Sequence, residues 1–231
     1  MLVLGFPAAA FDTNCFVLAT GPGQDALIVD PGIGVEQPLR ELLTEHRLRP
    51  AAVLLTHGHL DHVYAVTPVC GAGGIAAYIH ADDAYRLRDP LAQLDPGMIW
   101  MMESQFGAKA SWREPDDVRH VLDGEVLELA GLQCTVTHAP GHTEGSIVFI
   151  LPGAPDGINV EVNSTLVSGD LLFAGSIGRS DLPGGDEVAM NRSLRDVVLP
   201  MPDDRLVLPG HGPLTTIGIE RRRNPFLHSL R

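Results

Sequence analysis

The fold is decided by the stretch Val53–His62, which reads V-L-L-T-H-G-H-L-D-H. Its apolar start predicts a buried strand over residues 51–55, and its end packs three histidines and an aspartate into six residues. The histidines on either side of Gly58 alternate as on an extended segment, so two imidazoles can converge on one point, and the glycine lets the backbone bend. Asp61 and His62 then open a predicted helix over residues 63–69 and face a second point nearby. Clustered imidazoles and carboxylates suit zinc, iron or manganese, whereas the alternative is a polar turn with scattered surface histidines.

Length, composition and charge narrow the class of protein. The chain has 231 residues, of which 45% are hydrophobic and 19% charged, enough for one ordinary core in a single domain over residues 1–231. The net charge of −13, with Lys109 as the only lysine, argues against nucleic acid and against an anionic membrane surface. No apolar run approaches a membrane span, and Met1–Phe6 lacks the basic flank of a signal peptide. We expect a cytoplasmic monomer or small homo-oligomer that acts on a small molecule.

The cysteines carry no visible motif. They are widely separated and odd in number, at Cys15, Cys70 and Cys134. Neither a disulfide framework nor a paired-cysteine metal site fits that spacing. We therefore expect three buried thiols in a reducing cytoplasm.

Strands and helices alternate along both halves of the chain. Apolar runs divided by turn residues predict a β-meander at residues 2–6, 15–18 and 26–29. Further strands are predicted at residues 75–79, 124–129, 132–137, 145–151, 165–168 and 205–208. Helical spacing predicts helices at residues 36–46, 81–88 and 187–199, and another around Met98–Phe106 whose Met and aromatic side chains line a pocket or pack as core or lid. This alternation predicts an α/β protein in which two mixed sheets form a sandwich with helices outside.

Three more motifs each place a metal-type ligand on a loop after a predicted strand. They are A-P-G-H-T-E-G-S around His142, S-G-D-L-L-F around Asp170 and L-P-G-H-G-P around His211. A histidine after Pro-Gly is usually a turn residue, so each motif alone is weak evidence. In this order after the first stretch they are specific, and together they resemble the metallo-β-lactamase superfamily with its His-x-His-x-Asp-His signature.

The resemblance implies a fold and a metal centre. The expected fold is the four-layer αββα sandwich, with a shallow cleft at one end. The implied ligands fall into two groups with a shared carboxylate: His57, His59 and His142 for one ion, Asp61, His62 and His211 for the other, and Asp170 bridging both. Two zinc ions are expected, with iron or manganese as alternatives, and a metal-bridging hydroxide as the nucleophile. Asp61 and Asp170 are the predicted catalytic residues.

The segment after the bridging aspartate separates the members of this superfamily. Residues 170–179 resemble the glyoxalase II segment that ends in a basic residue contacting the thiol part of the substrate, and Arg179 stands at that position. With Arg222, Arg223 and Asn224 it is predicted to bind an acidic thiol conjugate. The alternatives are a structural salt bridge for Arg179 and a solvated helix face for residues 221–223. Only 20 residues follow His211, and in this the chain resembles short hydroxyacylglutathione hydrolase-like enzymes. The thiol of the substrate could therefore be glutathione or another low-molecular-weight thiol.

These features predict a dinuclear metal-dependent hydrolase of thioesters, of the S-2-hydroxyacylglutathione type or of other thiol conjugates. The alternatives within the same superfamily are a persulfide dioxygenase with a single iron, a lactone or ester hydrolase and a weak β-lactamase. A tRNA-processing nuclease is disfavoured by the acidity of the chain. A non-catalytic binding module is disfavoured because no ligand position is missing.

Overall fold

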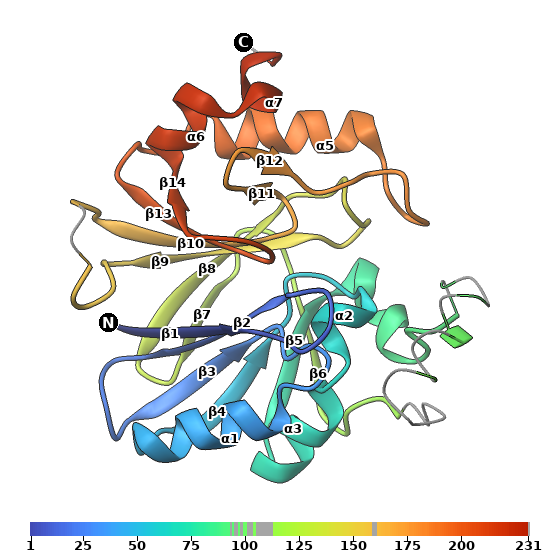
Figure 1. Ribbon diagram of the computed structural model, residues 1–231, viewed down its shortest axis with the longest axis vertical. Coiled ribbons are helices and arrows are strands. Elements are labelled where there is room, and N and C mark those ends of the chain that lie inside the picture. Colours follow the sequence, from blue (N-terminus) through green and yellow to red (C-terminus); the bar gives the residue numbers. More distant parts are fainter. Residues whose placement is uncertain are drawn as a thin grey trace.

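The computed structural model contains two six-stranded sheets packed face to face (Figure 1). It describes residues 1–92, 94, 97, 99–100, 104, 113–158 and 161–230. The first sheet holds six strands in sequence order: β1 (Leu2–Pro7), β2 (Asn14–Ala19), β3 (Asp25–Val29), β4 (Arg49–Leu54), β5 (Ala76–His80) and β6 (Val118–Val121). Its first three strands form an antiparallel meander, whereas β3 to β6 run parallel. The predicted meander is confirmed.

The second sheet is mostly antiparallel. Its order is β14-β13-β10-β9-β8-β7, and only β10 and β13 run parallel. The strands are β7 (Val126–Leu129), β8 (Leu132–His138), β9 (Ile147–Pro152), β10 (Ser164–Gly169), β13 (Arg205–Pro209) and β14 (Thr215–Thr216). A two-stranded ribbon, β11 (Leu172–Phe173) and β12 (Ser176–Ile177), follows β10. This short ribbon and the edge strands β6 and β14 were not among the predicted strands.

Helices cover the outer faces of both sheets and complete four layers. The helical segments are α1 (Glu36–Glu45), α2 (Leu60–Val63), α3 (Val66–Gly73), η1 (Ala81–Leu87), α5 (Glu187–Ser193), η2 (Leu194–Val198), α6 (Ile217–Arg223) and α7 (Pro225–His228). Helices α1 and α3 pack on the first sheet, and α5, η2, α6 and α7 pack on the second (Figure 1). The predicted αββα sandwich is confirmed. No helix among the described residues is both long and apolar enough to cross a membrane.

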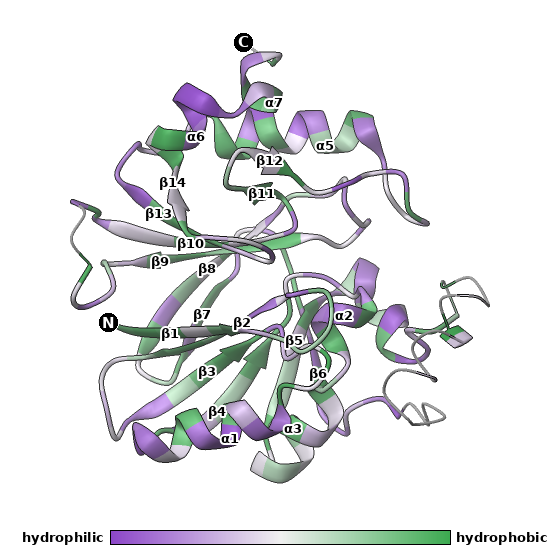
Figure 2. Ribbon diagram, viewed as in Figure 1, coloured by the Kyte–Doolittle hydropathy of each residue, from purple (hydrophilic) through white to green (hydrophobic). Residues whose placement is uncertain are grey.

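The strands are apolar throughout because they bury side chains on both faces. In β2, Phe16 and Leu18 point into the core between the sheets, whereas Cys15 and Val17 point into the core beneath the helices. This is the period-two alternation of a strand covered on both sides. Each fully buried Leu or Phe side chain contributes about 1.5–3 kcal/mol relative to exposure. Figure 2 shows the resulting pattern, with hydrophobic strands in both sheets and helices that alternate hydrophobic and hydrophilic residues.

The helix predicted at residues 63–69 is wrong in its bounds. The chain forms two short helices instead, and Ala65 between them has a non-helical ψ of 8°. Pro68 lies in the first turn of α3, where its missing N–H costs no hydrogen bond, so the proline favours the start of a new helix.

The thiols of Cys15, Cys70 and Cys134 are free and buried, as predicted. Most of the predicted helix at Met98–Phe106 lies outside the described residues, and Trp100 is 70% exposed.

Candidate metal centre

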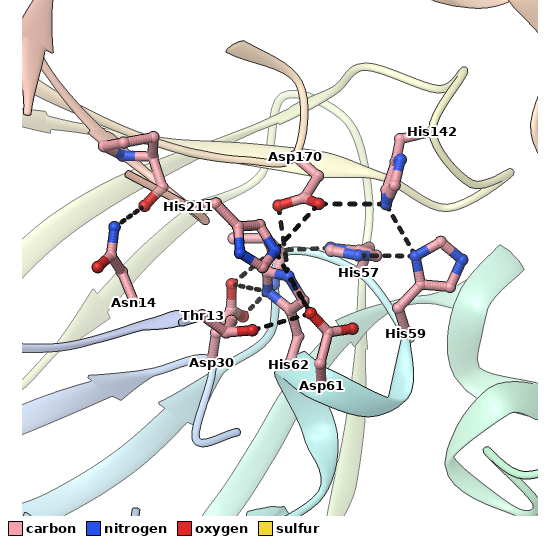
Figure 3. A network of polar contacts seen from close by, with 12 residues as sticks. Thr13, Asn14, Asp30, His57, His59, Asp61, His62, His142, Asp170 and His211 are labelled. Atoms are coloured by element: carbon pink, nitrogen blue, oxygen red, sulfur yellow. Dashed lines mark hydrogen bonds and ion pairs between the residues drawn. The ribbon is translucent and has the colours of Figure 1, made fainter. Parts of the chain in front are cut away.

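The seven predicted ligands meet at one end of the sandwich, where four strands run out into loops. These ligands lie on the segments that follow β4, β8, β10 and β13: His57, His59, Asp61, His62, His142, Asp170 and His211. They come from both sheets, so the cluster exists only when the two halves of the chain pack together (Figure 3). Loops at the carboxyl ends of strands are the usual place for function in α/β folds.

Three histidine nitrogens form the first group. Nε2 of His57 lies 3.1 Å from Nδ1 of His59, which lies 2.8 Å from Nε2 of His142. Nitrogens bound 2.0–2.1 Å from one tetrahedral zinc ion lie about 3.3 Å apart. The three nitrogens therefore already face a common point with nearly the spacing of a metal ligand set.

A second group lies beside the first and shares Asp170 with it. His211 Nε2 and His62 Nε2 lie 3.3 and 3.5 Å from Oδ2 of Asp61. Oδ1 of Asp170 lies 3.3 Å from His62 Nε2, and its Oδ2 lies 3.4 Å from His142 Nε2. Oδ2 also lies 3.5 Å from Nε2 of His211, so the Asp170 carboxylate lies between the two groups and contacts histidines of both (Figure 3).

Two buried polar atoms in this cluster have no hydrogen bond among the described residues. They are Nε2 of His62 and Oδ1 of Asp170, and they face each other. A buried polar atom without a partner costs stability, and a metal ion between the two groups would satisfy both atoms. The donor set of imidazole nitrogens and carboxylate oxygens matches zinc, iron or manganese. The residues present therefore fit a divalent metal centre.

Outer hydrogen bonds fix which nitrogen faces the cluster in four histidines: His57, His62, His142 and His211. Nδ1 of His62 donates to Oδ2 of Asp30 at 2.9 Å. The Thr56 hydroxyl donates to the same oxygen at 2.6 Å, so it accepts from Nδ1 of His57 at 3.1 Å. Both rings then carry a proton on Nδ1 and turn Nε2 toward the cluster. This role of Asp30 was not predicted from the sequence, although an acidic residue directly after the predicted strand at residues 26–29 is a visible signal.

Backbone carbonyls orient the rings of His142 and His211 so that Nε2 faces the cluster. Nδ1 of His142 donates to the carbonyl of Arg179 at 2.7 Å, and Nδ1 of His211 donates to the carbonyl of Phe11 at 3.0 Å. The Thr13 hydroxyl donates to Oδ2 of Asp61 at 2.8 Å. Such outer contacts orient metal ligands and raise their basicity.

Burial keeps the first group uncharged. It lowers the pKa of His57 well below the usual value and, together with the proximity of the His142 ring, lowers the pKa of His59 to about 3. Burial also lowers the pKa of His142. Neutral imidazole is the form that binds metals, so these three rings can accept an ion at neutral pH without first losing a proton.

The second group is charged instead. Burial opposes charge on all its members, yet the positive charge of His62 lowers the pKa of Asp61 and Asp170. Those carboxylates, with Asp30, raise the pKa of His62 well above its usual value. The two ionised aspartates thus demand a positive charge in the site, and a divalent cation supplies it.

Asp83, on η1, ties two ligand-bearing loops together and was missed by sequence reasoning. Its side chain is fully buried. Oδ2 accepts hydrogen bonds from the N–H of Gly58 and the hydroxyl of Thr143, both at 2.7 Å, and Oδ1 accepts from the N–H of Gly145 at 2.9 Å. One loop carries His57 and His59, and the other carries His142. No local pattern distinguishes Asp83 from its exposed neighbour Asp82.

The glycine of the Pro-Gly-His-Gly motif has a steric role. A Cβ on Gly210 would overlap Oδ1 of Asp170 and lie 2.8 Å from Cε1 of His62. A side chain at this position would therefore push the shared carboxylate out of place. The motif needs glycine because the backbone of residue 210 packs directly against the ligands.

The cluster opens into a cleft of about 710 Å³. Apolar side chains make up much of its wall: Phe11, Leu60, Leu94, Phe173, Ile177 and Leu182. Two arginines also line it. Arg86 is buried and pairs with Glu144 at 2.6 Å, whereas Arg179 is exposed and forms a bidentate pair with Asp181 at 2.7 and 2.8 Å. Arg179 therefore lies at the predicted place, and it also makes the salt bridge that was the alternative.

The other predicted substrate-binding residues do not line this cleft. Arg222 and Arg223 are exposed at the end of α6. Asn224 is fully buried, where it donates to the carbonyl of Ser176 at 2.9 Å and caps α7 by accepting from the N–H of Phe226. The structure therefore gives Asn224 a capping role and leaves the two arginines on a solvated helix face.

The family model of the metallo-beta-lactamase superfamily matches residues 8–211. The chain belongs to this superfamily. The match spans all seven clustered side chains. Membership and the His/Asp cluster together indicate binding of divalent metal ions, as the sequence motifs predicted.

Relatives and solved structures of this superfamily match nearly the whole chain. An uncharacterised protein of Mycobacterium tuberculosis is 45% identical over 100% of this chain and 99% of its own length. A protein of Haemophilus influenzae named hydroxyacylglutathione hydrolase GloC is 34% identical over 96% of both chains. The BLEG-1 B3 metallo-beta-lactamase structure has a TM-score of 0.79 and 34% identity, covering 98% of this chain and 99% of that one. The structure of TTHA1623 in a di-iron-bound form has a TM-score of 0.75 and 34% identity, covering 97% and 100%.

Proposed function

We propose that this protein is a dinuclear metal-dependent hydrolase that cleaves thioesters, of the S-2-hydroxyacylglutathione type or of another thiol. The observation that carries the proposal is the position of Asp170, whose carboxylate contacts His142 of the first ligand group and His62 and His211 of the second. A carboxylate shared in this way offsets the repulsion between two cations held side by side. The similarity to the Haemophilus hydroxyacylglutathione hydrolase supports thioesters as the substrate class.

The seven clustered side chains are the proposed metal ligands, and Asp61 and Asp170 are the proposed catalytic residues. When bound, two divalent ions supply an activated water and a Lewis acid for the acyl carbonyl. Zinc is the proposed metal. Iron is the alternative, which the di-iron form of TTHA1623 supports.

The chain itself orients the reaction. Hydrogen bonds from the histidines to Asp30, Thr56 and backbone carbonyls hold the ligand nitrogens toward one side, at the floor of the cleft. The Thr13 hydroxyl orients the Asp61 carboxylate by donating a hydrogen bond to its Oδ2. The apolar cleft wall excludes water from the acyl group, which strengthens each charge interaction at the floor.

Arg179 is the proposed contact for the thiol part of the substrate. It lies on the cleft wall, and its backbone carbonyl already orients His142. Its guanidinium is exposed, and among the described residues its ion pair is with the exposed Asp181. An acidic substrate can therefore compete for Arg179 at little energetic cost.

A paired assay with metal analysis tests the proposal. Two zinc-like ions per chain and cleavage of S-lactoylglutathione are the expected results. Rapid hydrolysis of a lactone or β-lactam with no thioester cleavage would move the chain to another activity of the superfamily. One iron per chain, with oxygen consumption on a persulfide, would instead make it a persulfide dioxygenase.

A further inference from the structure

A second cluster of potential metal ligands lies outside the seven-residue cluster. It consists of His80, Asp82 and His138, which can each place one ligand atom within 4.8 Å of the other two. His80 ends β5 in the first sheet, whereas His138 ends β8 in the second. Their rings stack at 4.2 Å between centroids with only 8° between planes, so one ring must turn before the in-plane lone pairs of both rings can reach one ion. The cluster therefore bridges the two sheets.

The hydrogen bond of His138 prepares its ring for a metal. Nε2 lies 2.8 Å from the carbonyl oxygen of Glu144, which can only accept, so Nε2 carries the proton. Nδ1 then presents a lone pair and has no hydrogen bond among the described residues. In His142 and His211 the roles of the two nitrogens are exchanged: Nδ1 donates to a backbone carbonyl, and Nε2 is the nitrogen that faces the cluster. Metal-binding histidines usually donate their second N–H in this way.

His80 and Asp82 supply the other two donors. Nδ1 of His80 lies 3.7 Å from Oδ2 of Asp82, near the roughly 3.3 Å between two ligands of one tetrahedral zinc ion. Nδ1 of His80 accepts a long hydrogen bond of 3.3 Å from the N–H of Asp82, and a cation can replace this bond. Burial, and then the proximity of His138, lower the pKa of His80, so its ring is neutral at pH 7.

We propose that His80, Asp82 and His138 form a third cation site, which takes a borderline divalent ion such as Zn²⁺, Co²⁺ or Cu²⁺. Two imidazoles and one carboxylate favour these ions over Mg²⁺ and Ca²⁺, which prefer all-oxygen sites. Three protein ligands leave a position for water.

An ion at this site joins the end of β5 to the end of β8. The first of these leads directly into η1, which carries Asp83, and the second leads into the loop that carries His142. Filling the site therefore braces the two segments that position the three-histidine group. The expected effect is on metal-dependent stability, because none of the three residues touches the cleft.

Equilibrium dialysis against Zn²⁺ tests the site directly. The wild type is expected to bind one more ion per chain than the variants Asp82→Asn and His138→Ala. The control variant His228→Ala, which replaces an exposed histidine on α7, is expected to bind as many ions as the wild type. Removing one ligand should lower the affinity for that ion by more than about tenfold, because losing even an outer hydrogen bond to a metal ligand lowers metal affinity by about 10–100-fold.

Two further measurements keep the result decisive. Asp82 has a 58% exposed side chain, so Asp82→Asn is expected to fold even where a histidine variant does not. Its thioester turnover should equal that of the wild type, and a Co²⁺ titration followed by visible absorption should lose its last binding phase. Equal zinc stoichiometry in the wild type and in both ligand variants would overturn the proposal, whatever the enzyme hydrolyses.

Discussion

Replacing Asp83 by Asn tests how the two ligand loops are held together. The carboxylate accepts three hydrogen bonds, and an amide of the same shape keeps only one acceptor oxygen. If that oxygen keeps Gly58 and Thr143, the new NH₂ faces the N–H of Gly145. One charge-assisted hydrogen bond is lost at about 1.5–3 kcal/mol, and a buried donor is left unpaired at about 1–3 kcal/mol. We expect the free energy of unfolding to fall by about 2.5–6 kcal/mol.

Thermal unfolding and metal binding measure the two consequences. For a chain of this size the loss corresponds to a Tm lower by about 5–24 °C. Affinity for the ion of the three-histidine group should fall by about 10–100-fold, because Asp83 orients both loops that carry it. Asp196→Asn, which breaks only an exposed pair with Arg192, is the control and should change stability by less than about 0.5 kcal/mol. If Asp83→Asn behaves like this control in both measurements, the positioning role of Asp83 is refuted.

Four other substitutions probe the cluster and the cleft. Asp170→Ala should lose both ions and all turnover, as measured by elemental analysis and a thioester assay; a variant that keeps its full metal load contradicts the shared-carboxylate scheme. Arg179→Ala should raise KM for an anionic thioester far more than for a neutral one, whereas Asp181→Asn frees Arg179 and should lower KM for the anionic substrate by about two- to fivefold; equal effects on both substrates would remove Arg179 from substrate binding. Gly210→Ala should displace Asp170 and reduce bound metal, while Gly71→Ala, where an added Cβ meets nothing within 4 Å, should leave the metal content unchanged.

The sequence predicted the layers well because the strands bury both faces. Alternation such as Phe16 against Val17 is visible without any tertiary knowledge, and so are the loops that end in His142 or His211. The division of the helical segment after the first motif into α2 and α3 was not predicted. Proline is tolerated in the first turn of any helix, so Pro68 alone does not show where that helix begins.

Contacts between distant segments were the part that sequence reasoning missed. Asp83 matters because of Gly58 and Gly145, which lie 25 and 62 residues away along the chain. Asn224 follows a run of arginines that suggested an anion site, yet packing buries it as a helix cap. Composition and spacing carry no information on such pairings, so only the three-dimensional structure distinguishes them.

Stepwise metal reconstitution tests the central claim most directly. The metal-free protein is titrated with Zn²⁺ while cleavage of S-lactoylglutathione is followed. Turnover is predicted to need both ions of the Asp170 centre and to stop rising at two equivalents per chain, with any ion at His80 and His138 binding later without further effect. A plateau at one equivalent, or no thioester cleavage at any metal load, would contradict the account.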